Sequence, residues 1–279
     1  MHFLILTILC STSIALILKH NDTKRGNPIV LIVGNYLTAS VIALIFMLLK
    51  ETLFSVETLI FGAILGLLFV ASFFAFAKAV SNAGTALATI SSRLSVIIPI
   101  VFSIIIFDEH PSALKLTGFL FTVITFVFFY FSLLEQNNSS GSKGKYLLLL
   151  FVLISIGLND FSMKIYKSVK PETEEAFFVF TIFLFAFLYS TIFIVIKKIK
   201  IHKKTFFTGV GLGVPNVFST IFLLAALSQQ PAIIVYPTIN IGIIILTAVG
   251  AYVLWREGIN KAGIAALLSG IFAIVFLSL

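Results

Sequence analysis

Residues 62–81 read GAILGLLFVASFFAFAKAVS, and residues 209–228 read GVGLGVPNVFSTIFLLAALS. Both stretches are apolar, and both open with a pair of glycines four positions apart. An offset of 147 positions, which is close to half of the 279 residues, relates them and indicates a duplicated chain. The matching positions are Gly62 with Gly209, Gly66 with Gly213, Ala79 with Ala226 and Ser81 with Ser228.

The composition of the chain predicts a membrane protein. Hydrophobic residues make up 59% of it, charged residues 11%, and its mean hydropathy is +1.15. A soluble domain of this length cannot cover so much apolar surface, so lipid must cover it. A helix needs about 20 apolar residues to cross a hydrocarbon core of about 30 Å. We therefore expect an all-α integral membrane protein with ten transmembrane helices at residues 3–18, 29–49, 59–77, 85–107, 116–134, 146–164, 176–196, 206–227, 231–255 and 262–279.

A polar segment divides these spans into two equal groups. Residues 135–145 read EQNNSSGSKGK, which predicts a flexible linker. It separates a first five-helix repeat, 1–134, from a second, 146–279. Because each repeat has an odd number of spans, the second enters the bilayer from the opposite side, and the two repeats have inverted topology. Inverted repeats are typical of transporters whose central site opens to either face.

Residues 84–118 carry a more specific pattern, GTALATISSRLSVIIPIVFSIIIFDEHPSALKLTG, with Pro99 in mid-helix and Glu109 near its end. Residues 231–270 repeat the plan with Glu257 and Gly263, although the proline is displaced to Pro237 and the interval from acid to glycine is shorter. The pattern resembles the EamA-type half-repeat of the drug/metabolite transporter superfamily. This resemblance covers nearly the whole chain. It implies a ten-helix carrier of amino acids, nucleotide sugars, sugar phosphates or other metabolites, with a central cavity between the halves.

Two ionisable residues lie well inside the predicted spans, and such residues are candidates for function because the bilayer makes them costly. Arg93 lies about 9 residues, or roughly 13 Å, into the fourth span. With Thr89 and Ser92 beside it, we expect it to bind the substrate; the alternative is that it pairs with backbone carbonyls or a structural acid. Asp160 is expected to take up and release a proton during transport, the alternative being an i, i+4 pair with Lys164.

Polar side chains of the second half could complete the site. Tyr236 and Asn240 share one face of the ninth span, and Asn216 lies in the eighth. We expect these three to hydrogen-bond to the substrate. The alternative for each is a contact between helices, which contributes about 0.6 kcal/mol in membrane proteins.

Prolines, glycines and the repeated acids are interpreted structurally. Pro99, Pro215 and Pro237 each remove a backbone donor and predict interrupted or kinked helices. The repeated glycines predict close packing of helices rather than binding. Glu109 and Glu257 lie at span ends, and we interpret them as folding or gating caps rather than as substrate ligands.

These features favour a secondary transporter that works by alternating access. Its substrate is expected to be a small polar metabolite such as an amino acid or organic anion, because a guanidinium matches a carboxylate. The first alternative is a non-transporting membrane partner subunit, with a cavity filled by apolar side chains. An integral membrane enzyme fits less well, because the spans hold a single deep acid and all four histidines lie at span ends or in loops. No catalytic residue, metal or cofactor is predicted.

The net charge of +8 is interpreted as a membrane feature rather than a nucleic-acid signal, because the basic residues sit between spans. Thirteen Lys and Arg residues lie on the side of the first connection, including KKIKIHKK at 197–204, and five on the other. The positive-inside rule then predicts outward-facing termini in a bacterial cytoplasmic (inner) membrane, whereas many EamA-type carriers have cytoplasmic termini. The expected partners are a metabolite and membrane lipid, with a homodimer left open.

Overall fold

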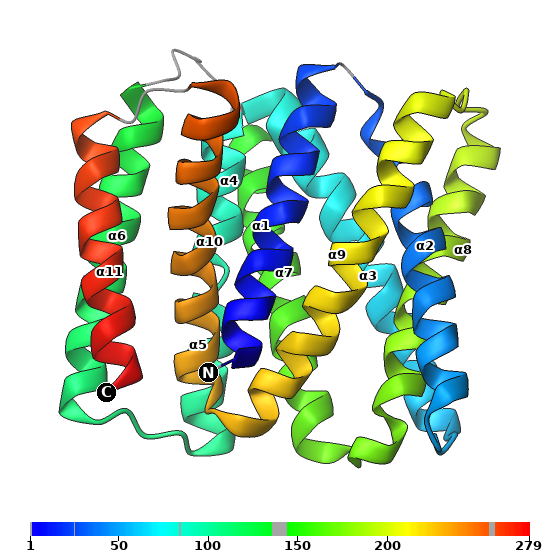
Figure 1. Cartoon of the computed structure of the whole chain (residues 1–279), viewed down its shortest axis with the longest axis horizontal. Coiled ribbons are helices and arrows are strands. Elements are labelled where there is room, and N and C mark those ends of the chain that lie inside the picture. The colour runs from blue at the N-terminus through cyan, green and yellow to red at the C-terminus, as the bar shows by residue number, and fades with distance from the viewer. Residues whose placement is uncertain (1, 25, 84, 136–143, 257–259) are drawn as a thin grey trace.

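The computed structural model describes residues 2–24, 26–83, 85–135, 144–256 and 260–279. These residues form eleven α-helices and one short 3-10 helix, η1 (Glu172–Glu174), and no strand occurs among them (Figure 1). The α-helices are α1 (His2–Thr23), α2 (Pro28–Leu49), α3 (Val56–Ala83), α4 (Thr85–Leu94), α5 (Ile97–Phe107), α6 (Ala113–Glu135), α7 (Gly144–Val169), α8 (Glu175–Ile196), α9 (Lys203–Gln229), α10 (Ala232–Trp255) and α11 (Lys261–Ser278).

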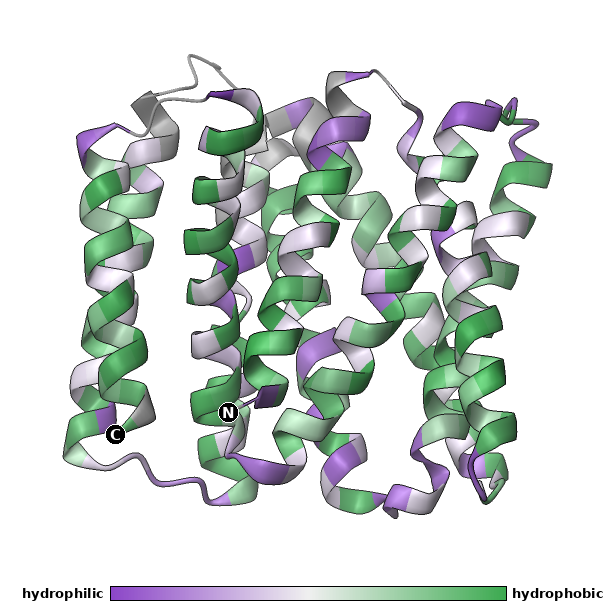
Figure 2. Ribbon diagram, viewed as in Figure 1, coloured by the Kyte–Doolittle hydropathy of each residue, from purple (hydrophilic) through white to green (hydrophobic). Residues whose placement is uncertain are grey.

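Eight of the described helices are long and apolar enough to cross a membrane. Two further apolar segments, Ser91–Phe107 and Lys261–Leu277, are shorter. Figure 2 shows hydrophobic residues along the middles of the helices and hydrophilic residues gathered mainly at their two ends. Large apolar side chains such as Leu147 and Phe207 are exposed on the outer surface, where lipid rather than water suits them. The chain is therefore an all-α integral membrane protein.

The starts of two helices follow from local sequence. Asn27 and Asn260 precede α2 and α11, and each side chain accepts a hydrogen bond from a backbone N–H of the first turn. Asparagine is favoured there because it satisfies a donor that the helix leaves open. Asp108 and Arg256 end α5 and α10 in the left-handed conformation, at φ 54° and 53°.

The helices run back and forth between two ends of the molecule. We call one the terminal end, because both chain termini lie toward it, together with the connections α5–α6, α7–α8 and α9–α10 (Figure 1). The opposite end, which we call the basic end, carries the lysine-rich connection between α8 and α9 at residues 197–204. Helices α1 and α7, which would open the two predicted repeats, run in opposite directions (Figure 1).

Helices from the two halves of the chain alternate in the packing. Helix α2 packs against α8 and α9, α3 packs against α7 and α8, and α1 packs against α9 and α10. Helices α6 and α11 form a pair at one side of the molecule (Figure 1). The largest buried cluster accordingly draws side chains from both halves, including Ile32, Phe178, Val217 and Val235.

The repeated glycines lie where these helices approach most closely. Gly62 and Gly66 on α3 face α8, and Gly209 and Gly213 on α9 face α2. A Cβ on Gly209 would lie 2.0 Å from the carbonyl oxygen of Leu31. The expected packing role of these glycines is therefore confirmed.

The span expected at residues 85–107 consists of two helices, because α4 and α5 are separated by a turn at Ser95 and Val96, and the interruption predicted at Pro99 is confirmed. Pro99 explains the break, since it has no N–H to donate to the carbonyl of Ser95 four residues earlier. That carbonyl instead accepts a bond from the residue three positions on, at 3.0 Å. At Pro215 and Pro237 no break occurs, because α9 and α10 continue through them, and the kinks expected there stay a prediction.

Candidate functional site

Arg93 and Asn240 meet where the first and second halves of the chain face each other. Arg93 lies in the last turn of α4, and its Nη1 donates a hydrogen bond to Oδ1 of Asn240 on α10 at 3.3 Å. The amide of Asn240 is held in turn, because its Nδ2 donates to the backbone carbonyl of Tyr236 at 3.0 Å. Asn240 is buried and Arg93 is half-buried. The guanidinium thus points at α10, in the second half of the chain.

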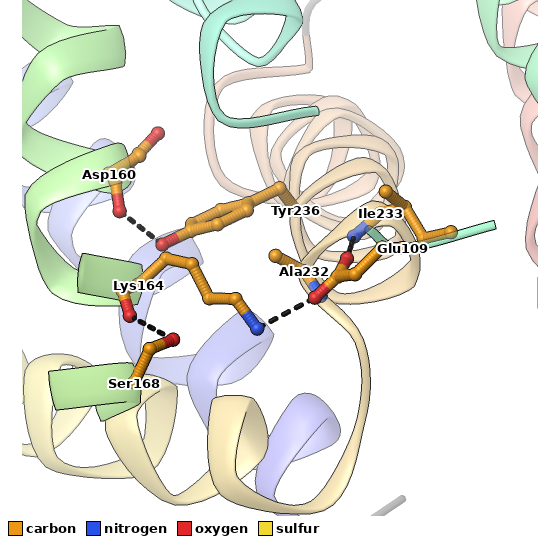
Figure 3. Close-up of polar contacts among 7 residues, drawn as sticks. All are labelled: Glu109, Asp160, Lys164, Ser168, Ala232, Ile233 and Tyr236. Carbon is orange, nitrogen blue, oxygen red and sulfur yellow. Dashed lines mark hydrogen bonds and ion pairs between the residues drawn. The ribbon is translucent and has the colours of Figure 1, made fainter. Parts of the chain in front are cut away.

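Asp160 on α7 is the acid nearest this arginine in electrostatic terms. Its charge acts on the Arg93 guanidinium, but among the described residues no ion pair joins the two side chains. The backbone carbonyl of Asp160 accepts a hydrogen bond from the hydroxyl of Tyr236 on α10 (Figure 3). The neighbouring Asn159 donates to the Ser72 hydroxyl of α3 at 2.8 Å. The carboxylate of Asp160 therefore acts on the arginine electrostatically without forming an ion pair with it in this structure.

Lys164, which could have formed a helical pair with Asp160, reaches Glu109 instead. The lysine Nζ lies 2.6 Å from Oε1 of Glu109, and both side chains are about nine-tenths buried (Figure 3). The same carboxylate accepts hydrogen bonds from the backbone N–H groups of Ala232 and Ile233, at 3.1 and 3.0 Å. Glu109 thus caps the start of α10, which is the cap expected from the sequence.

Each of three successive turns of α10 forms a hydrogen bond with a group from another part of the chain. The first turn, at Ala232 and Ile233, holds Glu109; the second, at Tyr236, holds the backbone of Asp160; the third, at Asn240, holds Arg93. We call this row of contacts the α10 column. Residues four apart lie on one face of a helix, so the column faces one way along about 12 Å of α10.

The other predicted site residues lie in different surroundings. Asn216 on α9 donates to Oδ1 of the buried Asn35 on α2 at 3.1 Å, so it holds two helices together. Thr89 and Ser92 are half-buried on α4, within one turn of Arg93. The structure therefore joins Arg93 to Asn240 and Tyr236 to the backbone of Asp160, whereas Asn216 makes a contact between helices.

Two hollows in the structure lie away from the α10 column. A small one, of about 20 Å³, is lined by residues of α2, α8 and α9, including Ala43, Val179 and Ile221. An open one, of about 960 Å³, lies at the basic end, and its lining includes Lys24 and Lys200. Within the described part of the chain, no three His, Cys, Asp or Glu side chains gather as a metal site would require.

Sequence reasoning missed two partners in this region. It had no means of pairing Lys164 with Glu109, because these residues are 55 positions apart and Asp160 offers Lys164 a local partner. It also missed Asn35 as the partner of Asn216, although an asparagine within a 22-residue apolar helix was a usable signal. Glu257, the repeat counterpart of Glu109, lies outside the described residues.

Comparison with known proteins finds relatives at the level of the whole chain. An uncharacterized protein of Haemophilus influenzae is 30% identical over 297 aligned positions, which cover 99% of this chain and 98% of the relative. A solved crystal structure superposes with a TM-score of 0.76 at 15% identity, covering 98% of this chain and 94% of that one, and this likeness concerns the fold alone. No protein-family model matches the sequence.

Proposed function

The chain belongs to the same family as the Haemophilus influenzae protein, and we propose that this family member is a secondary transporter of the drug/metabolite transporter type. It would move a small polar metabolite, such as an amino acid or organic anion, across the bacterial cytoplasmic membrane by alternating access. The single observation that carries the proposal is the bond from Arg93 to Asn240, which places a half-buried arginine between the two halves. A charge held at that depth is expensive, and function is the usual reason for keeping it.

Inverted repeats, the architecture that alternating access uses, are supported by contacts that recur at one offset. Gly66 approaches Ile182 and Ala186, and Gly213 approaches Asn35 and Ala39. Adding 147 to the second set of partners reproduces the first. Exchange of the halves therefore turns the α3–α8 contact into the α9–α2 contact, as an internal twofold relation requires.

Polar contacts support the same relation. Ser72 on α3 bonds to Asn159 on α7, and Ser219 on α9 bonds to Ser11 on α1. Ser72 and Ser219 are 147 positions apart, and so are Arg93 and Asn240. Under this relation Arg93 and Asn240 are counterparts that meet across the axis. In this proposal the short segments Ser91–Phe107 and Lys261–Leu277 complete ten spans with the eight long helices.

The substrate class follows from the donors at the site. An arginine offers a planar fork of N–H groups that suits a carboxylate or phosphate. Its present partner, the neutral Asn240 oxygen, supplies one acceptor at 3.3 Å and no negative charge. An incoming carboxylate would make stronger, charge-assisted bonds with the same fork and displace the amide. Asp160, close by and not ion-paired with the arginine, is then placed to release or accept a proton as the solute binds.

Two other functions are less well supported. A non-transporting partner subunit would not need an arginine held between its halves at this depth, and the bond of Arg93 to Asn240 favours the carrier. An integral membrane enzyme would need cooperating acids or metal ligands at one depth, whereas Asp160 and Glu109 meet different turns of α10 and the Glu109 carboxylate is already bonded to Lys164 and the helix start.

A ligand screen tests the proposal. The purified protein is heated with a panel of amino acids, organic acids, sugar phosphates and nucleotide sugars, and the melting temperature is recorded. A solute that binds the folded state, present at about 100 times its Kd, stabilises it by about 2.7 kcal/mol, which a thermal shift detects. The solute should stabilise wild type and Lys197→Ala but not Arg93→Ala. A panel that stabilises none of the three, or all three equally, contradicts the assignment.

A further inference from the structure

Glu109 makes three contacts at a single point of the fold. Its two carboxylate oxygens accept the first free N–H groups of α10, and Oε1 also lies 2.6 Å from the Lys164 ammonium (Figure 3). The donors at a helix start carry partial positive charge, so the carboxylate neutralises both a helix end and a lysine. Removing the carboxylate leaves the largely buried lysine with the Phe107 ring, 5.1 Å away, but without a counter-charge, and it removes the acceptor of the two N–H groups at the helix start.

These contacts join the two halves of the chain. Glu109 follows α5 in the first half, whereas Lys164 on α7 and the start of α10 belong to the second. Helix α5 packs against both α7 and α10. The end of α5, the last turns of α7 and the first turn of α10 all lie toward the terminal end (Figure 1), two turns of α10 away from Asn240, the partner of Arg93. The carboxylate therefore links the two halves of the chain on the side of the proposed transport site that faces the terminal end.

Two helices connect these Glu109 contacts to the Arg93 site. On α10, Glu109 holds the first turn, and the Tyr236 and Asn240 contacts follow at the next two turns. On α7, Lys164 lies one turn from Asp160. Movement of α10 away from Glu109 would therefore be transmitted to the groups that hold Arg93 and Asp160.

We propose that Glu109, Lys164 and the first turn of α10 form a gate that closes the Arg93 site toward the terminal end. This inference rests on the proposed transport function and adds to it the element that controls access from one side. The structure is the state with this gate closed. Opening requires the carboxylate to separate both from Lys164 on α7 and from the first turn of α10, so that water replaces the lysine and the two N–H groups as its partners. The ion pair and the helix cap are then broken and remade in each transport cycle.

Accessibility of an engineered cysteine tests the gate without any substrate. In a Cys10→Ser background, Ser92→Cys and, separately, Thr89→Cys report access to the region of Arg93. A membrane-impermeant maleimide is added to sealed vesicles from the side of the terminal end, and the labelling rate is measured. The gate variants are Glu109→Ala, Glu109→Gln and Lys164→Met. The matched control is Glu57→Ala, which breaks an ion pair with Lys170 at the same end but away from the α10 column.

The expected labelling rates are ordered. Glu109→Ala and Lys164→Met should raise the rate at least about tenfold at one reporter position, because a shift of that size needs little more than one lost charge-assisted contact. Glu109→Gln retains an oxygen for one N–H but no charge, and should fall between wild type and Glu109→Ala. Glu57→Ala should label like wild type.

Other outcomes overturn the gate or the transporter separately. If folded Glu109→Gln and Lys164→Met both label at the wild-type rate at both reporter positions, Glu109 is only a helix cap. If the control labels as fast as the gate variants, general loosening rather than gating explains the effect. If the gate variants label faster but the wild-type protein transports no solute, the result supports the gate and contradicts the proposed transport function. If Glu109→Ala fails to fold, the labelling rates of Glu109→Gln and Lys164→Met test the gate instead.

Discussion

Arg93 is held by a weak contact in this structure, a 3.3 Å bond to a neutral amide. A guanidinium with such a partner, beside an acid that is not ion-paired with it, is poised to exchange partners, which is what a binding site for a carboxylate needs. Substitutions that separate charge from geometry can therefore resolve its role.

We expect transport to fall in the order Arg, Lys, Ala at position 93. Lysine keeps the charge and loses the fork, whereas alanine loses both. Because a hydrogen bond to a charged group contributes about 1.5–3 kcal/mol, uptake at limiting solute should fall about tenfold for Arg93→Lys and about a hundredfold for Arg93→Ala. Solute uptake by reconstituted vesicles measures this. Normal transport by Arg93→Ala, or its loss through misfolding alone, would make the residue structural.

Asp160 should couple transport to protons. Asp160→Asn removes the titrating group while keeping the backbone carbonyl that Tyr236 bonds. We expect this variant to lose uptake driven by a pH gradient and to retain exchange of labelled for unlabelled solute. Asp108→Asn, an exposed carboxylate at the end of α5, serves as the control. Gradient-driven uptake that survives in Asp160→Asn would assign coupling to another ion or group.

At the scale of single helices, α2 and α9 approach so closely that one methyl group decides the contact. A Cβ on Gly209 would meet backbone atoms of Leu31, whereas Gly211, two residues on, has nothing within 4 Å. Gly209→Ala should destabilise the protein by about 1–3 kcal/mol, the usual effect of overpacking. Gly211→Ala should be neutral or stabilising, since alanine favours a helix. Melting temperatures of the two variants compare them directly, and equal values would mean that α2 and α9 can move apart freely.

The helices themselves were largely predictable from the sequence, because an apolar run of sufficient length must form its hydrogen bonds internally in lipid. The ends of α2 and α8 agree with the predicted spans to within a residue. The turn at Ser95 was not predictable, because a proline removes one bond but does not say whether the helix bends or stops. The chain forms a turn just before Pro99, whereas α10 continues through Pro237.

Predictability is lower for the site, because partners there come from distant parts of the chain. Depth in the bilayer pointed to Arg93 and Asp160 before any contact was known. The same reasoning grouped Asn216 with them, although its amide faces Asn35 on α2. One sequence shows that a residue is polar and deep, but not which helix it faces.

At the scale of the whole molecule, the charges at the two ends predict its orientation. The terminal end carries both termini, and the basic end carries residues 197–204 with their five lysines (Figure 1). If the positive-inside rule governs insertion, a reporter active only in the cytoplasm should be active when fused after Lys200 and silent when fused at Leu279. The reverse pattern would place the termini in the cytoplasm, as in many EamA-type carriers, and the gate at Glu109 with them.

The break between α4 and α5 has a consequence for the direction of flux. Under the proposed repeat relation its counterpart is α10, which continues through Pro237 for 24 residues, so the two halves of the proposed carrier differ in helix continuity at this point. Halves that differ in this way do not pass through symmetry-related shapes when they exchange roles. The routes to the two faces then differ in barrier height, and solute gradients of equal size but opposite sign drive unequal initial fluxes. We therefore expect the proposed carrier to transport its solute faster in one direction than in the other.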